Sequence, residues 1–171
     1  MRILKTTKVL SVLAASTFAF SSAHADTFSQ SATVEFVSPI TVTENTQLNF
    51  GTVETGAGAG TTLILDTAGA ITGTASANYI SGAAAGDFSV NAQGSTISIE
   101  VNNFGANTVT LSTPTCSYDG AGAAGCDTTI TGLATDGTDK TLLIGATLTL
   151  AGSEGAGSTY SPTFDIVVNY E

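Results

Sequence analysis

Phe164-Asp-Ile166-Val-Val168-Asn-Tyr170, near the carboxyl end of the chain, places an apolar side chain at every second position. Successive side chains of a strand point to opposite faces, so this alternation predicts a strand with one buried and one exposed face. The same period recurs along the chain between turns rich in Gly. We therefore expect strands at residues 33–37, 40–43, 61–66, 71–76, 87–91, 97–101, 108–111, 128–131, 144–150 and 164–171.

The composition also favours strands over helices. After residue 25, Thr is the commonest residue type, while the strong helix formers Lys, Arg, Met and Gln are nearly absent. No stretch of ten or more residues shows the 3.6-residue period of a helix. Short strands that each have one apolar face must close as two packed antiparallel sheets or as a barrel. We expect an all-β fold, an antiparallel β-sandwich of about 8–10 short strands.

The first 25 residues have the three parts of a signal peptide. Residues 1–8 are basic, residues 9–20 are an apolar run of twelve, and Ala23-His24-Ala25 has the small-x-small pattern of a cleavage site. Twelve residues are too few to cross about 30 Å of hydrocarbon, which takes about twenty. We expect cleavage after Ala25, no insertion into a membrane, and an exported single domain comprising residues 26–171.

Cleavage would leave a strongly acidic chain. Lys140 would be the only base against fourteen acidic residues, a net charge of 1 − 14 = −13. No His or Arg would remain, which excludes catalytic triads that use histidine, imidazole metal ligands and bidentate phosphate clamps. The negative charge repels nucleic-acid phosphates. We expect a protein that is not an enzyme and binds no nucleic acid.

The two cysteines, Cys116 and Cys126, form a simple pattern in an exported chain. In an oxidising compartment this pair predicts a structural disulfide that closes a hairpin or loop. The spacing is not C-x-x-C, and no third type of metal ligand is present. Between the cysteines, Gly120-Ala-Gly122-Ala-Ala-Gly125 matches the letters of a dinucleotide-binding motif, but no helical pattern follows it. We interpret it as a loop of small residues.

Four aspartates cluster around predicted loops. Oxygen ligands of this kind bind Ca²⁺, but the sequence lacks the D-x-D-x-D-G spacing of a dedicated calcium loop. A solvated acidic surface is the favoured interpretation, with calcium as the alternative, and no cofactor is expected. The residues concerned are Asp119, Asp127, Asp136 and Asp139.

Both ends of the predicted domain resemble a known family. Pro39-Ile-Thr-Val-Thr43, then Leu48-Asn-Phe50-Gly51-Thr-Val53 and a Gly-rich turn, resemble the opening of exported bacterial domains known as domain-of-unknown-function family 4402. Residues 145–150 and 157–170 resemble its far end. That family is similar in turn to spore coat proteins of the U type and to pilins of chaperone–usher fimbriae, which share the turn carried here by Leu48, Phe50 and Gly51.

The resemblance implies a particular fold and assembly mechanism. In such pilins an immunoglobulin-like sandwich lacks one strand, and the amino-terminal extension of the next subunit fills the gap. The donor strand would then present Ala32, Val34 and Phe36. The edge that needs covering would be the last strand, with Phe164, Ile166, Val168 and Tyr170 on one face.

Two functions are compatible with these patterns. The first is a structural subunit of a surface filament or coat, located at the bacterial surface and assembled by strand exchange. Its partners would be copies of itself, with a periplasmic chaperone and an outer-membrane usher. The second is a monomeric secreted or periplasmic module that binds carbohydrate or calcium. Sugar sites favour exposed aromatic platforms, and the absence of Trp disfavours a carbohydrate ligand.

Overall fold

The computed structural model describes residues 31, 33–94, 96–105 and 107–171. They fall into two units, of which the first ends at Glu35 and the second comprises residues 36–171. Every strand belongs to the second unit, the domain described below. The predicted signal peptide and its cleavage site lie outside the described residues.

The domain is all-β, and every strand pairing is antiparallel. Outside the strands, the described residues contain one short 3₁₀ helix, Ser76–Asn78, and no helix of a length and hydropathy that would cross a membrane. The strands are β1 (Thr41–Thr46), β2 (Asn49–Val53), β3 (Thr62–Leu65), β4 (Ile71–Thr72), β5 (Tyr79–Ala84), β6 (Gly86–Asn91), β7 (Ile97–Asn102), β8 (Thr110–Tyr118), β9 (Ala124–Gly125), β10 (Ile130–Leu133), β11 (Asp139–Thr149) and β12 (Asp165–Tyr170).

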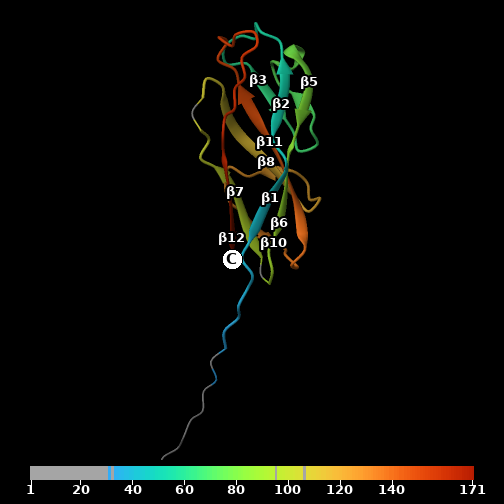
Figure 1. Ribbon diagram of the computed structural model, residues 1–171, viewed down its shortest axis with the longest axis vertical. Helices are drawn as coiled ribbons and strands as arrows, with labels where there is room; N and C mark the ends of the chain where they lie inside the picture. Colours follow the sequence, from blue (N-terminus) through green and yellow to red (C-terminus); the bar gives the residue numbers. More distant parts are fainter. Residues whose placement is uncertain (1–30, 32, 95, 106) are drawn as a thin grey trace, which may run out of the picture. The chain divides into compact units, whose positions relative to one another are not determined.

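The long strand β11 organises the larger sheet (Figure 1). Its first half pairs with β6, its second half pairs with β3, and β8 pairs along both halves. β1 extends the sheet beyond β6, β4 beyond β3, and β9 beyond β8. The change of partner occurs at Gly145, where a Cβ would lie 2.3 Å from the carbonyl oxygen of Leu65. A residue without a side chain is required there because the neighbouring backbone approaches so closely.

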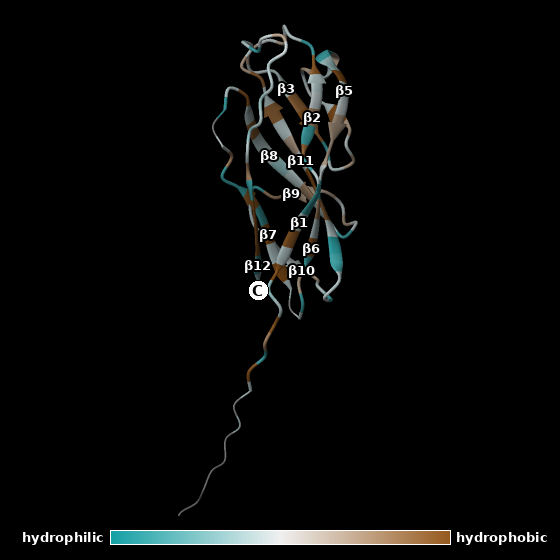
Figure 2. Ribbon diagram, viewed as in Figure 1, coloured by the Kyte–Doolittle hydropathy of each residue, from teal (hydrophilic) through white to brown (hydrophobic). Residues whose placement is uncertain are grey.

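The second layer consists of two smaller sheets. One has the order β10-β7-β12, and the other pairs β2 with β5. Apolar residues recur along the strands of both layers (Figure 2). One core cluster joins the larger sheet to β7, with Val90, Leu142 and Ile144 packed against Ile97 and Ile99. A second cluster joins its other half to β2 and β5. The core therefore lies between packed antiparallel sheets.

A disulfide joins Cys116 in β8 to Cys126, which follows β9. The predicted bridge is confirmed, and the described residues include no free cysteine. Cys126 is fully buried beside the first core cluster. Such a bridge is typical of proteins that fold in an oxidising compartment outside the cytoplasm.

Several sequence expectations about individual strands were wrong. Residues 33–37 form no strand, and β4 covers only the first two residues of the predicted strand at 71–76. β2, β5 and β9 were not expected as strands, so the structure has twelve rather than about 8–10. β2 and β5 contain Gly51 and Gly82, which weaken a strand pattern. These strands form because each pairs with the other, a tertiary effect that local periodicity does not report.

Candidate functional site

An open groove of about 1090 Å³ lies in the half of the domain that contains β2. One wall consists of the end of β1, β2 and the turn that follows it, residues 44 and 47–57. The other wall consists of residues 154–155 and 157–167, the segment that leads into β12. The two walls come from opposite ends of the domain's sequence, so only the folded chain forms the groove.

Part of the groove's lining is apolar. This part includes five buried side chains from the larger sheet and its flanking residues, namely Phe88, Val109, Leu111, Leu148 and Leu150. Most of these belong to the second core cluster, together with Phe50 and Phe164 from the two walls. We call these five buried residues the floor. These five side chains are 2–8% exposed, so the groove reaches the edge of the core without leaving the core open to solvent.

Unpaired strand edges border this groove. β12 pairs only with β7, β2 pairs only with β5, and β1 pairs only with β6, as far as the described residues extend. All six residues of β1 are exposed, although Val42 stands opposite the fully buried Val90. An unpaired edge presents free backbone N–H and C=O groups that can pair with an added strand.

A hydrogen-bonded junction closes the sandwich at the opposite end from the groove. The Tyr170 hydroxyl donates to the Ser38 carbonyl oxygen at 2.7 Å and accepts from the Gln93 N–H at 2.9 Å. The Ser38 hydroxyl donates to Oε1 of Gln93 at 3.0 Å. The junction therefore fixes the point where the amino-terminal segment joins the domain.

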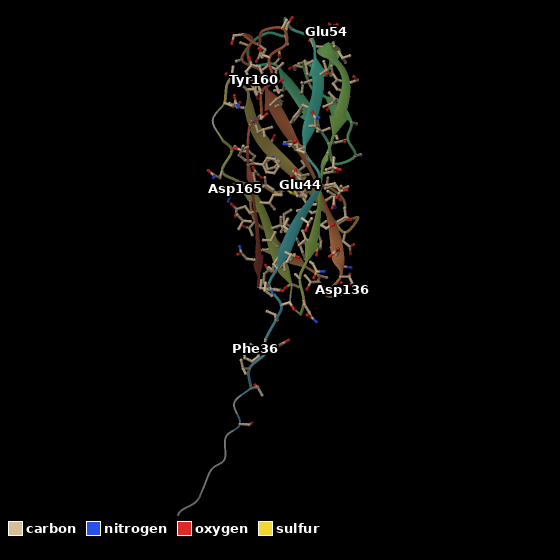
Figure 3. All side chains as sticks on the ribbon, in the orientation of Figure 1. Phe36, Glu44, Glu54, Asp136, Tyr160 and Asp165 are labelled. Atoms are coloured by element: carbon tan, nitrogen blue, oxygen red, sulfur yellow. A yellow bond between two sulfur atoms is a disulfide. The ribbon has the colours of Figure 1, made fainter. Side chains whose placement is uncertain are left out.

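The segment before this junction is exposed and partly apolar. Phe36 is 89% exposed, and Val37 is also exposed. In the first unit, Val34 is 74% exposed, while Ala32 lies outside the described residues. Figure 3 shows Phe36 beyond the end of the domain that is farther from Glu54 and Tyr160. Val34, Phe36 and Val37 are thus three exposed apolar side chains within four consecutive residues.

The groove carries acidic side chains and no basic ones. Four carboxylates contribute to its lining, namely Glu44, Glu54, Glu154 and Asp165. Oε1 of Glu154 accepts a hydrogen bond from the Ala151 N–H at 2.6 Å, and Oδ2 of Asp165 accepts one from Asn103 at 2.7 Å. We call these four residues the acidic rim.

Three of the four aspartates considered for calcium, Asp119, Asp136 and Asp139, have other partners. Lys140 Nζ lies 2.9 Å from Asp136 Oδ2 and 3.3 Å from Asp119 Oδ2. Hydrogen bonds from Thr138 and Lys140 lower the pKa of Asp136, and the two carboxylates raise the pKa of Lys140. Asp139 accepts a hydrogen bond from Asn91 at 2.8 Å. No group of three acidic, His or Cys side chains placed for a metal occurs among the described residues.

The groove brings together two sets of residues that the sequence had singled out separately. Leu48, Phe50 and Gly51 lie in one wall, and Phe164 and Ile166 lie in the other. All four candidate residues of the predicted last strand pack against the first core cluster, and Val168 and Tyr170 do not line the groove. Alternation in the sequence marks Leu111, Leu148 and Leu150 as core residues, but it cannot show that they also line a groove. The sequence analysis also did not identify the acidic rim.

These features define an all-β, disulfide-bonded domain with a groove that is lined by both apolar and polar residues and bordered by unpaired strand edges. Residues 40–170 match the family described as Domain of unknown function (DUF4402), and the chain belongs to that family. No curated protein and no solved structure matches the chain. The predicted resemblance to this family is confirmed.

Proposed function

We propose that the protein is a non-enzymatic structural subunit of a surface filament or coat, with a pilin-like sandwich that lacks one strand. The groove accepts the amino-terminal extension of a second copy, and the added strand lies along the free edge of β12. The observation that carries this proposal is the coincidence of a groove with an apolar floor, unpaired edges and an exposed apolar extension in one chain.

The side chains of the extension suit the floor. In an extended strand Val34 and Phe36 point to the same face, and Glu35 and Val37 point to the other. Insertion would bury the first pair against Leu111, Leu148 and Leu150. Burying each of these side chains contributes roughly 1.5–3 kcal/mol, and backbone hydrogen bonds to β12 add to that.

The placement of the two features favours open chains over closed dimers. The extension joins the domain near the end where β12 finishes, whereas the groove extends toward the end that carries Glu54 and Tyr160 (Figure 3). A copy beyond that end would direct its extension into the groove antiparallel to β12. A head-to-tail contact of this kind repeats without closing and produces a filament.

Export and partners complete the proposal. The signal peptide would deliver the chain to the periplasm, where the disulfide forms. An open groove over an apolar floor favours aggregation of the unassembled subunit. We therefore include a periplasmic chaperone that covers the groove and an outer-membrane usher that releases the subunit for assembly.

The test compares extension variants of the mature protein, residues 26–171. We expect the wild type to form oligomers in light scattering and electron microscopy, and the double variant Val34→Ser, Phe36→Ser to remain monomeric. Val37→Ser is the matched control, because it removes an apolar side chain from the opposite face of the same segment, and it should assemble like the wild type.

A monomeric wild type at high concentration, purified without a chaperone, would overturn the proposal. The same conclusion would follow if Val37→Ser impaired assembly as strongly as the double variant. Circular dichroism and unfolding curves of all three proteins establish that the domain is folded in each.

A further inference from the structure

The acidic rim borders the groove where an added strand would lie. Glu44 and Asp165 lie near the middle of the domain, and Glu54 lies toward the end from which the strand would arrive (Figure 3). Glu44, Glu54 and Asp165 are exposed, and Glu154 is half-buried. Lys140 is the only Lys, Arg or His after residue 24, and it contacts Asp119 and Asp136, which do not line the groove. No basic side chain offsets the rim.

The chain's own extension has the same sign of charge. Residues 26–38 include Asp26 and Glu35 and no Lys, Arg or His. Glu35 lies between Val34 and Phe36, so insertion of that pair into the groove places the Glu35 carboxylate on the solvent side, beside the rim. The apolar contacts therefore favour self-association, while the charges oppose it.

We propose that the acidic rim is an electrostatic gate that controls which strand the groove accepts. This inference rests on the proposed strand exchange. At low ionic strength the rim repels the acidic extension of another copy and slows its insertion into the groove. A strand with a basic residue at the position of Glu35 would instead be attracted. The screening length falls from about 30 Å at 0.01 M salt to about 10 Å at 0.1 M. Added salt therefore weakens the repulsion between the rim and the native extension and allows the extension to bind.

Reversing the charge at residue 35 gives the sharpest test, because it should reverse the effect of salt on the assembly rate. Assembly of the mature wild type, followed by light scattering between 10 and 500 mM NaCl, should become about tenfold faster as salt rises. The variant Glu35→Lys should assemble faster than the wild type at low salt and slow down as salt rises. A Glu35→Lys protein that accelerates with salt like the wild type would overturn the gate.

A second pair of variants separates the rim from the net charge of the whole molecule. Glu44→Gln with Glu54→Gln removes two charges from the rim, and Asp127→Asn with Asp139→Asn removes two exposed charges that do not line the groove. The rim pair should raise the low-salt assembly rate severalfold, whereas the control pair should change it less than about twofold.

Equal acceleration by both pairs would assign the effect to net charge and overturn the gate while leaving strand exchange intact. Absence of assembly in every variant at every salt concentration would instead overturn strand exchange itself. All these substitutions are at exposed positions, and unfolding curves check that each variant is folded.

Discussion

Lys140 forms the one charged cluster in which acidic and basic side chains meet among the described residues. Asp136 accepts hydrogen bonds from the Thr138 hydroxyl and N–H, and it forms an ion pair with Lys140. These contacts favour the ionised carboxylate, so the pKa of Asp136 lies below its ordinary value. A lowered pKa means that these contacts stabilise the fold fully above the unfolded-state pKa of about 3.9 and are lost as the pH falls below it. Lys140, with its raised pKa, loses its contribution only as the pH rises above about 10.4.

We therefore expect Asp136→Asn to lower the urea midpoint of unfolding slightly at neutral pH, because the exposed pair is screened by solvent. The difference from the wild type should shrink as the pH falls from 5 towards 2, because Asp136 in the unfolded wild type becomes protonated over this range and the advantage of its folded-state contacts is progressively lost. Asp127→Asn is the control and should show no such convergence. A difference that persists unchanged at pH 2 would show that the variant acts through packing rather than through charge.

At the scale of elements, the pairing of β2 with β5 forms one wall of the groove and depends on a single glycine. Gly51 has a φ of +75°, and its N–H donates a hydrogen bond to Asn49 Oδ1 at 2.7 Å. A Cβ at this position would lie 2.2 Å from the Ser81 carbonyl oxygen and 2.8 Å from the Ala83 nitrogen. Both the conformation and the close approach require glycine.

Gly51→Ala should destabilise the protein and loosen this wall. The positive φ costs roughly 1–2 kcal/mol, and the overlap with β5 adds roughly 1–3 kcal/mol. Gly56→Ala is the matched control, because Gly56 has a φ of +98° but nothing lies within 4 Å of its added Cβ. It should incur only the conformational cost. Urea unfolding measures both variants, and equal losses would show that the approach to β5 contributes nothing.

The same elements show how far the sequence predicts this molecule. Alternating residues identified β7, β11 and β12, because more and less buried positions alternate along much of each strand, and the cysteine pair predicted the disulfide. Leu48, Phe50 and Gly51 predicted the family but were interpreted as a turn, although Phe50 and Gly51 belong to β2. The groove could not be predicted from the sequence, because its walls come from segments far apart in the chain. No local pattern of residues shows that these segments lie on either side of a groove.

At the scale of the whole molecule, the proposed acceptor groove and the proposed donor extension are separate parts of one chain. Under the proposed strand exchange, a subunit that lacks the extension still has a groove and would receive a strand without supplying one. Such a subunit ends a head-to-tail chain at one end only, whereas a symmetric dimer contact would lose both of its halves together.

Deleting residues 26–37 should therefore produce a chain terminator. Mixed with mature wild-type protein at about one part in ten, the truncated subunit should shorten filaments in electron micrographs, to an average set by the mixing ratio. A groove variant that also lacks the extension, with Phe50→Asp added, is the control: it neither donates nor accepts, so it should leave filament length unchanged. Should the truncated subunit leave filament length unchanged while remaining folded in circular dichroism, the extension would not be the donor, and the contact between copies would have to lie on another face of the domain.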